Sequence, residues 1–315
     1  QAEDGIRDLV RSRGLGDVYK RQVSDQIRNS SLSPDAKRMA ISARGEIFNV
    51  PVKEGITLNL SKSSNAHDRN VQWSPDGKWI AYISDKSGEF EIYMQDTDGK
   101  KEPIQLTKNA DTYKFKLSWS PDSKKILWSD KKMRLRYIDV ESKKITEVAQ
   151  SGVWEFNYFN WSPNSQWIAY STNERNAMSR IMLYDTESKK SFAVTDGWYN
   201  STNPVFSDDG KFLLFVSDRD FNPIYSQTEW NVAYRDMSKI YMAILSKDTE
   251  NPFATKNDVV NEKEAEKNLE FKIDTEGISD RIVALDIKAS NYWNITMFDD
   301  MIYYNRRSAL GGKSE

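Results

Sequence analysis

The sequence predicts an all-β fold, a β-propeller built from four-stranded antiparallel blades. The first observation is a hairpin at residues 71–82, V-Q-W-S-P-D-G-K-W-I-A-Y, in which the turn Ser74-Pro75-Asp76-Gly77 joins two apolar segments. Pro pre-sets φ at the second turn position, Asp suits the third, and Gly tolerates the positive φ that returns the chain. The hairpin therefore marks the first two strands of one blade.

The second observation is that this hairpin recurs along the chain. Degenerate copies start at Ser33 (S-P-D-A), Ser120 (S-P-D-S), Ser162 (S-P-N-S) and Ser207 (S-D-D-G), so successive copies lie 41, 46, 42 and 45 residues apart. A period in the forties with four strand signals in each period is typical of a propeller. Five repeats are expected, near residues 27–60, 70–107, 115–149, 157–195 and 202–274.

The third observation concerns the second strand of each repeat. These strands read M-A-I-S, W-I-A-Y-I-S, I-L-W-S, W-I-A-Y-S and F-L-L-F-V-S, with apolar residues at successive positions. Both faces must then be buried, as in a strand between two neighbouring blades, whereas the more polar fourth strands fit an outer edge. Only Gly77 and Gly210 keep the turn glycine, and Ala36, Ser123 and Ser165 take its place in the other copies, so the turn motif is kept less strictly than the apolar second strand.

The fifth repeat departs from the pattern. A long aromatic connection, residues 218–239, separates its second strand from the third, which is expected at residues 240–245. Residues 246–269 are polar and mixed in charge, so a mobile loop is expected there. Residues 270–273 (E-F-K-I) are expected to close the blade as its fourth strand, and residues 281–287 (R-I-V-A-L-D-I) form another strand candidate.

The two ends of the chain differ from the repeats. Residues 1–22 show neither strand alternation nor an apolar signal-peptide core, and they resemble a translated sequencing adaptor. We interpret them as a non-native or disordered leader; the alternative is a charged N-terminal helix. The propeller is then expected to occupy residues 23–287, and residues 288–315 to begin a second, truncated propeller.

Composition limits the classes of partner. The 315 residues are 29% charged, with a mean hydropathy of −0.73, and no window approaches the 18 consecutive apolar residues of a membrane span. The net charge of −2, with both signs interspersed, gives no reason to propose nucleic acid or a membrane as a partner. The absence of cysteine excludes disulfides and thiolate metal sites, and ten tryptophans suit a well-filled β core.

Two groups of residues carry a family resemblance. The hairpin copies resemble TolB and WD-like propeller repeats. Residues 217–254 (S-D-R-D-F-N-P and onward), followed by residues 272–284 and by Asn291-Tyr292-Trp293, are similar to the junction of the two N-terminal propellers in tricorn-type serine proteases. The resemblance covers nearly all of residues 27–305. It implies most of a first, six-bladed propeller, as an incomplete ring, and the first hairpin of a second.

The resemblance also implies a function. The parent would be a large peptidase with two propellers, a PDZ domain and a catalytic domain containing a Ser nucleophile and a His. This chain would be a non-catalytic portion that helps to gate or guide peptides to that catalytic domain. The implied partners are peptides or unfolded polypeptide, and a homo-oligomer of the full-length parent. A cytoplasmic location is implied, while the sequence leaves a periplasmic or secreted one open.

Candidate catalytic or metal-binding residues have simpler interpretations as turns and loops. His67 is the only histidine, no G-x-S-x-G motif occurs, and neither a catalytic triad nor a zinc site is supported. Asp96-Thr97-Asp98-Gly99 imitates the start of a calcium loop but lacks the later ligands, so a hairpin turn is expected. The acidic pairs Asp208-Asp209 and Asp299-Asp300 also suit turns. No catalytic residue of the family can be carried over, and no cofactor is implied.

Aromatic clusters are the remaining candidates for a binding site. Residues 153–161 read V-W-E-F-N-Y-F-N-W, and Trp198-Tyr199 occupies the equivalent position between blades one repeat later. One interpretation is that these rings fill the core between blades. The other is that Trp154, Phe156, Trp198 and Tyr199 line one mouth of the propeller channel and contact extended peptide, because aromatic rings offer a large contact area at low entropic cost.

Two hypotheses for function follow. The first is the non-catalytic propeller portion of a tricorn-like serine peptidase, which rests on the junction segment. The second is a stand-alone TolB-like propeller that acts as a protein–protein interaction module and catalyses nothing.

Overall fold

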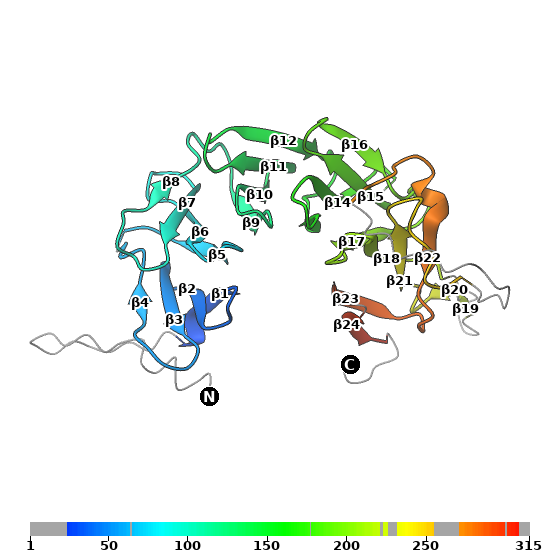
Figure 1. The fold of residues 1–315 in the computed structure, drawn as a ribbon, viewed down its shortest axis with the longest axis horizontal. Coiled ribbons are helices and arrows are strands. Elements are labelled where there is room, and N and C mark those ends of the chain that lie inside the picture. Colours follow the sequence, from blue (N-terminus) through cyan, green and yellow to red (C-terminus); the bar gives the residue numbers. More distant parts are fainter. Residues whose placement is uncertain are drawn as a thin grey trace, which may run out of the picture. The chain divides into compact units, whose positions relative to one another are not determined.

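Five four-stranded antiparallel sheets make up most of the computed structural model (Figure 1). It describes residues 24–63, 65–176, 178–220, 223–225, 232–254, 271–299 and 301–308. The chain forms two compact units, one ending at Gln150 and the other beginning at Ser151. The predicted all-β fold of propeller blades is confirmed. Residues 1–22 and most of the loop expected at residues 246–269 lie outside the described residues.

The first unit contains blades 1 to 3, whose strands pair in sequence order. A short 3₁₀ helix, η2 (Ser24–Gln26), precedes them. Blade 1 consists of β1 (Ile27–Leu32), β2 (Arg38–Ala43), β3 (Glu46–Pro51) and β4 (Leu58–Asn59). Blade 2 consists of β5 (Arg69–Trp73), β6 (Trp79–Ser84), β7 (Glu91–Asp96) and β8 (Ile104–Gln105). Blade 3 consists of β9 (Lys114–Trp119), β10 (Lys125–Asp130), β11 (Arg134–Asp139) and β12 (Ile145–Gln150).

The second unit contains blades 4 and 5 and a further hairpin. Blade 4 consists of β13 (Phe159–Trp161), β14 (Trp167–Asn173), β15 (Ser179–Asp185) and β16 (Lys190–Ala193). Blade 5 consists of β17 (Ser201–Phe206), β18 (Phe212–Ser217), β21 (Lys239–Ile244) and β22 (Ile282–Ala284), with the small hairpin β19 (Pro223–Tyr225) and β20 (Val232–Tyr234) between β18 and β21. The 3₁₀ helix η3 (Ile278–Arg281) precedes β22, and the last hairpin is β23 (Asn291–Phe298) with β24 (Met301–Arg307).

The fourth strand of blade 5 differs from the expectation. Residues 271–273 form no strand, and β22 pairs with β21 instead, so the fourth-strand prediction for residues 270–273 is wrong. Phe271 and Ile273 still pack against the core between blades 4 and 5, which explains their apolar pattern. The guanidinium of Arg281 donates to the carbonyl oxygens of Ile244 (3.0 Å) and Glu276 (3.1 Å), which holds the chain where it returns to the sheet.

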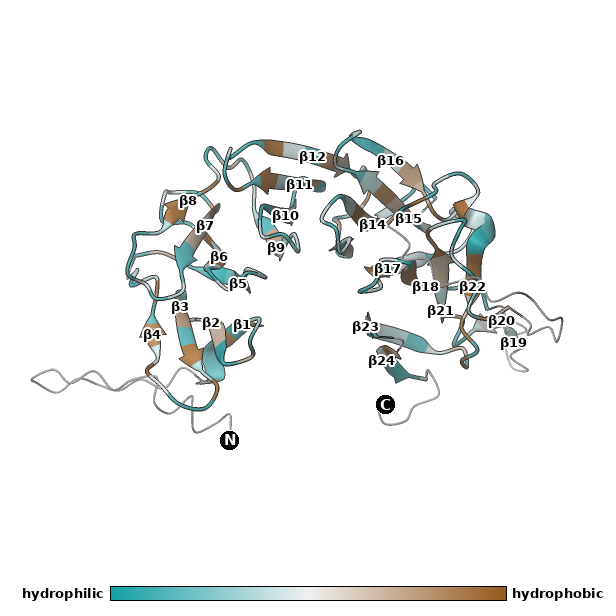
Figure 2. Ribbon diagram, viewed as in Figure 1, coloured by the Kyte–Doolittle hydropathy of each residue, from teal (hydrophilic) through white to brown (hydrophobic). Residues whose placement is uncertain are grey.

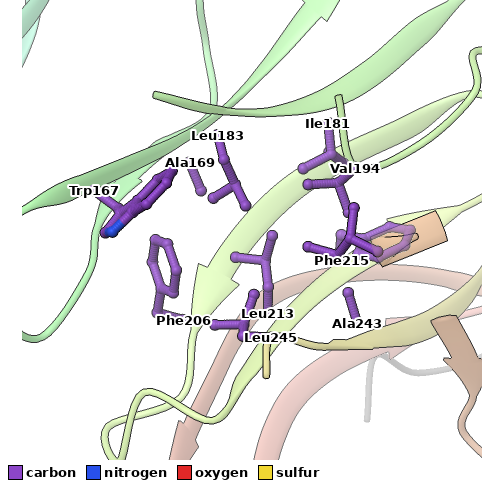
Figure 3. Packing of buried hydrophobic residues seen from close by; sticks show 11 residues of the cluster. Trp167, Ala169, Ile181, Leu183, Val194, Phe206, Leu213, Phe215, Ala243 and Leu245 are labelled. Atoms are coloured by element: carbon purple, nitrogen blue, oxygen red, sulfur yellow. The ribbon is translucent and has the colours of Figure 1, made fainter. Parts of the chain in front are cut away.

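The second strands are buried on both faces, as predicted. Every residue of β18 is buried, and in β6 and β10 only the first residue is partly exposed. In Figure 2, hydrophobic segments lie along the strands, whereas the connecting loops are largely hydrophilic. Figure 3 shows the core between blades 4 and 5, where side chains of one sheet meet those of the next. Because two sheets share each such core, the blades stabilise one another by burial of apolar surface.

The five turns between first and second strands share one backbone geometry, whether or not glycine is present. The fourth turn residue has a positive φ in every copy: 56° at Ala36, 73° at Gly77, 59° at Ser123, 62° at Ser165 and 71° at Gly210. In blade 2 the buried hydroxyl of Ser74 donates to Asp76 Oδ1 (2.6 Å) and accepts from the backbone N–H of Trp79 (3.0 Å). The same two bonds form in the other four copies, with Asn164 as the acceptor in blade 4. Side-chain hydrogen bonds therefore fix the turn whether or not glycine is present.

Glycine substitutions in these turns should have opposite effects on stability. Ala36→Gly is expected to raise the free energy of unfolding by about 0.5–1 kcal/mol, because a positive φ is strained for alanine and unstrained for glycine. Gly77→Ala should lower it by about 1 kcal/mol through backbone strain alone, since its added Cβ would lie 4.0 Å from the nearest side chain. Gly210→Ala should cost more, because its Cβ would overlap the ring of Phe271. Urea unfolding gives the free energy of unfolding of each variant. An Ala36→Gly variant that is less stable than the unmodified chain would contradict the strain argued for Ala36.

The turn carboxylates should make the fold sensitive to acid. Burial disfavours ionisation of Asp76, but bonds from the Ser74 hydroxyl and the Lys78 backbone N–H outweigh it and hold the pKa of Asp76 below its ordinary value. The pKa values of Asp122 and Asp209 are lowered in the same way. A carboxyl whose pKa is lower in the folded state adds stability above its unfolded pKa, about 3.9, and that stability is lost as pH falls through the folded value. Thermal melts between pH 7 and pH 3 should show a smaller decrease in Tm for Asp76→Asn than for the unmodified chain. Equal decreases in Tm would argue against this role of the Asp76 carboxylate.

The β23–β24 hairpin packs on blade 5. Tyr292 and Ile295 of β23 are buried in a core with Leu214 of β18 and Met242 of β21. The backbone N–H of Asp299, in the hairpin turn, donates to Asp208 in the corresponding turn of blade 5 (3.2 Å). A matching bond, from the N–H of Asp76 to Ser123 Oγ (3.0 Å), joins the turns of blades 2 and 3. The hairpin therefore contacts blade 5 as a following blade would.

Among the described residues, no helix has the length and apolar character needed to cross a membrane.

Candidate functional site

The first strands of neighbouring blades lie side by side within each unit. In the first unit β1 contacts β5 and β5 contacts β9; Ser31 Oγ accepts from the N–H of Trp73 (2.9 Å), and Trp119 Nε1 donates to the carbonyl of Gln72 (3.3 Å). In the second unit β13 contacts β17, and Asn160 Oδ1 accepts from the N–H of Phe206 (3.2 Å). These bonds join the C-terminal parts of the strands, so within each unit the loops that enter the first strands gather at one end of the blades.

Three of the four predicted aromatic residues are exposed on such loops in the second unit. Trp154 lies between β12 and β13 with 59% of its surface exposed; Trp198 and Tyr199 lie between β16 and β17 with 79% and 46% exposed. Phe156, by contrast, is 2% exposed and packs edge-on against Tyr170, with ring centroids 5.7 Å apart. The core interpretation therefore holds for Phe156, and the other three rings are available at the surface.

Trp154 borders a pocket of about 290 Å³ between blades 4 and 5. The pocket is also lined by Asn157 and Tyr158 at the entry to β13, Asn173 at the end of β14 and Thr202 in β17. Glu155 also lines the pocket, so its walls combine aromatic faces with amide, hydroxyl and carboxylate groups. Such a lining suits an extended polypeptide, whose backbone presents donors and acceptors between apolar side chains.

The loop that carries Trp198 is held in place by its own backbone and by blade 4. The N–H of Trp198 donates to Asp196 Oδ1 (3.1 Å), and Arg180 Nη2 donates to the carbonyl of Asp196 (3.1 Å). Gly197 has a φ of 82°, and its Cβ position lies 3.3 Å from the Arg180 guanidinium, so a larger residue would be both strained and crowded there. Trp198 is thus presented from a fixed loop although its ring is exposed.

The other candidate residues lie in turns and loops, as predicted. His67 is exposed, and its backbone N–H donates to Asp85 Oδ1 (2.6 Å). Asp96-Thr97-Asp98-Gly99 forms the turn after β7, in which the N–H of Gly99 donates to the carbonyl of Asp96 (3.2 Å). Asp208-Asp209 lies in the β17–β18 turn, and Asp299 in the β23–β24 turn. In the described part of the chain, no three His, Cys, Asp or Glu side chains are grouped so that they could hold a metal ion.

A second pocket, which the sequence did not suggest, lies in the first unit. It has a volume of about 620 Å³ and is lined by Arg28 of β1, Arg44 after β2, and Arg69 of β5. The three arginines come from three different elements and are separated by 16 and 25 residues along the chain. No local motif could reveal such a group; only the alignment of blade ends within the unit brings it together.

Comparison with known proteins supports the architecture. A family model described as the tricorn protease second beta propeller domain matches residues 27–315. A putative Tricorn-like protease C-terminal subunit from Sulfurisphaera tokodaii is 24% identical over 259 residues, which cover 82% of this chain and 29% of that protein. Tricorn protease homolog 1 from Streptomyces coelicolor is 24% identical over 296 residues, covering 89% of this chain and 28% of that protein. The chain thus spans less than a third of the length of these relatives.

A solved structure and the extent of the family match refine the assignment. The crystal structure of the tricorn protease aligns with a TM-score of 0.78 at 19% identity, covering 93% of this chain and 29% of that one, which supports the fold. The sequence had pointed to the first propeller with the start of a second, whereas the matching model describes the second propeller and includes the β23–β24 hairpin in one match. The chain belongs to the family of the tricorn protease second β-propeller domain.

Proposed function

We propose that this chain is a non-catalytic propeller portion of a tricorn-like serine peptidase, and that it guides peptides or unfolded polypeptide toward a catalytic domain of the parent protein. The observation that carries the proposal is the exposure of Trp154, Trp198 and Tyr199 on loops at one end of blades 4 and 5. Large apolar rings are costly to leave in water, and tryptophan and tyrosine are enriched where proteins contact other polypeptides. Family membership supplies the context, since the named relatives are tricorn proteases and homologues.

The contact that we propose is an extended polypeptide lying across these loops. The polar groups of the Trp154 pocket would bond its backbone, while Trp198 and Tyr199 would cover its side chains. Because aromatic rings have no charge and few rotatable bonds, they bind many sequences with little loss of entropy. Broad specificity of this kind suits a conduit better than a selective binding module.

Binding of an unfolded polypeptide tests the proposal. A fluorescently labelled, unstructured peptide should bind the chain, with an increase in fluorescence anisotropy. The double variant Trp154→Ala, Trp198→Ala should weaken that binding about tenfold, because exposed anchors of this type contribute 1–2 kcal/mol. Trp293→Ala is the matched control, since this tryptophan is 37% exposed in β23 and belongs to neither loop, and its loss should leave binding unchanged.

Two results would contradict the proposal. One is the absence of peptide binding by the unmodified chain; the other is equal binding by the double variant.

No observation favours the stand-alone interaction module. In the parent protein we further propose assembly as a homo-oligomer and a cytoplasmic location. We also propose that residues 288–308 continue the same propeller, because the β23–β24 hairpin packs on blade 5.

A further inference from the structure

The pocket in the first unit is basic. We call the group formed by Arg28, Arg44, His67, Arg69 and Tyr113 the basic pocket; it encloses about 620 Å³. An adjoining pocket of about 310 Å³ shares Arg69 and Tyr113 with it. Together they extend from the end of blades 1 and 2 along the first strands of blades 2 and 3. A cavity of this size can hold one or two amino-acid residues of a bound chain.

Arg69 is the fixed centre of the basic pocket. Only 7% of its surface is exposed, and its guanidinium carbon lies 3.7 Å from the ring centroid of Tyr113 and 4.4 Å from that of Phe90. Nη2 donates to the carbonyl of Lys114 (3.1 Å), whereas the buried Nε has no hydrogen-bond partner. Burial lowers the pKa of Arg69, while the charges of Tyr113 and Asp85 raise it. A buried guanidinium with an unused donor is therefore incompletely compensated.

Arg28 and Arg44 are placed at the rim by irregular backbone. Arg28 lies at the irregularity in the β1–β2 pairing, between Ile27 and Asn29, and such bulges redirect side chains. Arg44 has a φ of 55° in the tight turn from β2 to β3. Both side chains are exposed, and within the described residues neither they nor Arg69 has a carboxylate at salt-bridge distance. Asp85, the acid whose charge reaches Arg69, already accepts the N–H of His67.

We propose that the basic pocket binds a carboxylate group of a polypeptide. The guanidinium fork matches the geometry of a carboxylate, and bonds between two charged groups are the strongest hydrogen bonds available at such a site. Arg69 is pre-ordered between two rings, so little side-chain entropy is lost when a ligand arrives. The carboxylate can be an acidic side chain or the C-terminus of the bound chain, and both present the same pair of oxygens. The proposal rests on the proposed function, because it takes polypeptide as the ligand.

Four labelled peptides of equal length separate these sources. They combine acidic or amide side chains with a free or amidated C-terminus, and their affinity for the full chain is measured by fluorescence anisotropy at low and high salt. A peptide with carboxylates should bind about tenfold tighter than the fully neutral peptide, and the difference should shrink as salt screens the exposed arginines. Comparison of the affinities of the four peptides separates the effect of a free C-terminus from the effect of acidic side chains, and so identifies which carboxylate is bound.

The double variant Arg28→Gln, Arg44→Gln should lose most of this preference and leave affinity for the neutral peptide unchanged. Both residues are exposed, so folding is expected to persist and can be checked by thermal melting. Lys53→Gln with Lys108→Gln removes the same charge from exposed positions outside the pocket and should keep the preference. Equal affinity for acidic and neutral peptides, or an undiminished preference in the arginine variant, would overturn the carboxylate pocket alone. Failure of every peptide to bind would overturn the proposed function as well.

Discussion

Replacement of Lys114 by methionine is expected to lower the free energy of unfolding by about 3–5 kcal/mol, because it leaves a buried carboxylate without its cation. The side chains of Lys114 and Glu91 are 3% and 2% exposed, and Nζ lies 3.3 Å from Oε2 of Glu91. Nζ also donates to the carbonyl of Phe90 (2.6 Å), and Glu91 Oε1 accepts the N–H of Ala110 (2.6 Å). Burial lowers the pKa of Lys114, and the charge of Glu91 opposes that effect. The pair thus joins β7 of blade 2 to β9 of blade 3.

A double-mutant cycle separates the ion pair from packing. Glu91→Gln in the Lys114→Met background removes the unpaired charge, so the double variant should regain part of the stability lost by Lys114→Met. Chemical denaturation gives the free energies, and a shift in denaturant midpoint without a change in slope would show that stability alone changed. A loss below about 1 kcal/mol for Lys114→Met would mean that the site is hydrated and the pair unimportant.

Truncation of Trp73 should have an effect of similar size. Trp73 is 8% exposed in a core with Ala40 and Ile47 of blade 1 and Ile80 of blade 2. Trp73→Ala removes a large ring from this interface and leaves a cavity, which costs about 3–5 kcal/mol. Thermal melting should show a marked decrease in Tm.

The exposed Trp198 supplies the control for this prediction. Trp198→Ala removes the same atoms from a surface position, so the stability should change by no more than about 0.5 kcal/mol. Equal effects of the two substitutions would mean that the blades do not share the core described for Trp73.

Repeated local chemistry explains how much of the fold could be predicted. The turn, Ser-x-Asp in four copies and Ser-x-Asn in blade 4, and the consecutive apolar residues of the second strand each act over a few positions, so their pattern survives in all five copies. The turn glycine varies between copies because side-chain bonds hold Ala36 at a positive φ without it. The fourth strand of blade 5 was predicted wrongly because Phe271 packs against the core without joining the sheet. An apolar pattern alone cannot distinguish a hydrogen-bonded strand from an irregular segment that packs on a core.

The candidate site could be predicted only in part. The aromatic segment around Trp154 was visible in the sequence, yet burial separates Phe156 from Trp154 two positions earlier, and periodicity in an irregular loop does not report burial. The arginines of the basic pocket were missed because each lies in a different element, and isolated charges usually belong to a solvated surface. Such sites depend on the alignment of blade ends, which sequence spacing does not show.

Hydrolysis by the proposed parent peptidase tests the proposed guiding role most directly. The parent protein with Trp154→Ala and Trp198→Ala should be compared with the unmodified parent on a long unfolded polypeptide and on a short chromogenic peptide. We expect kcat/KM for the long substrate to fall about tenfold, because only that substrate needs the propeller contacts, and kcat/KM for the short peptide to stay unchanged. Equal kcat/KM values for the long substrate in both proteins, or an equal loss for the two substrates, would contradict a role of this chain in guiding polypeptide.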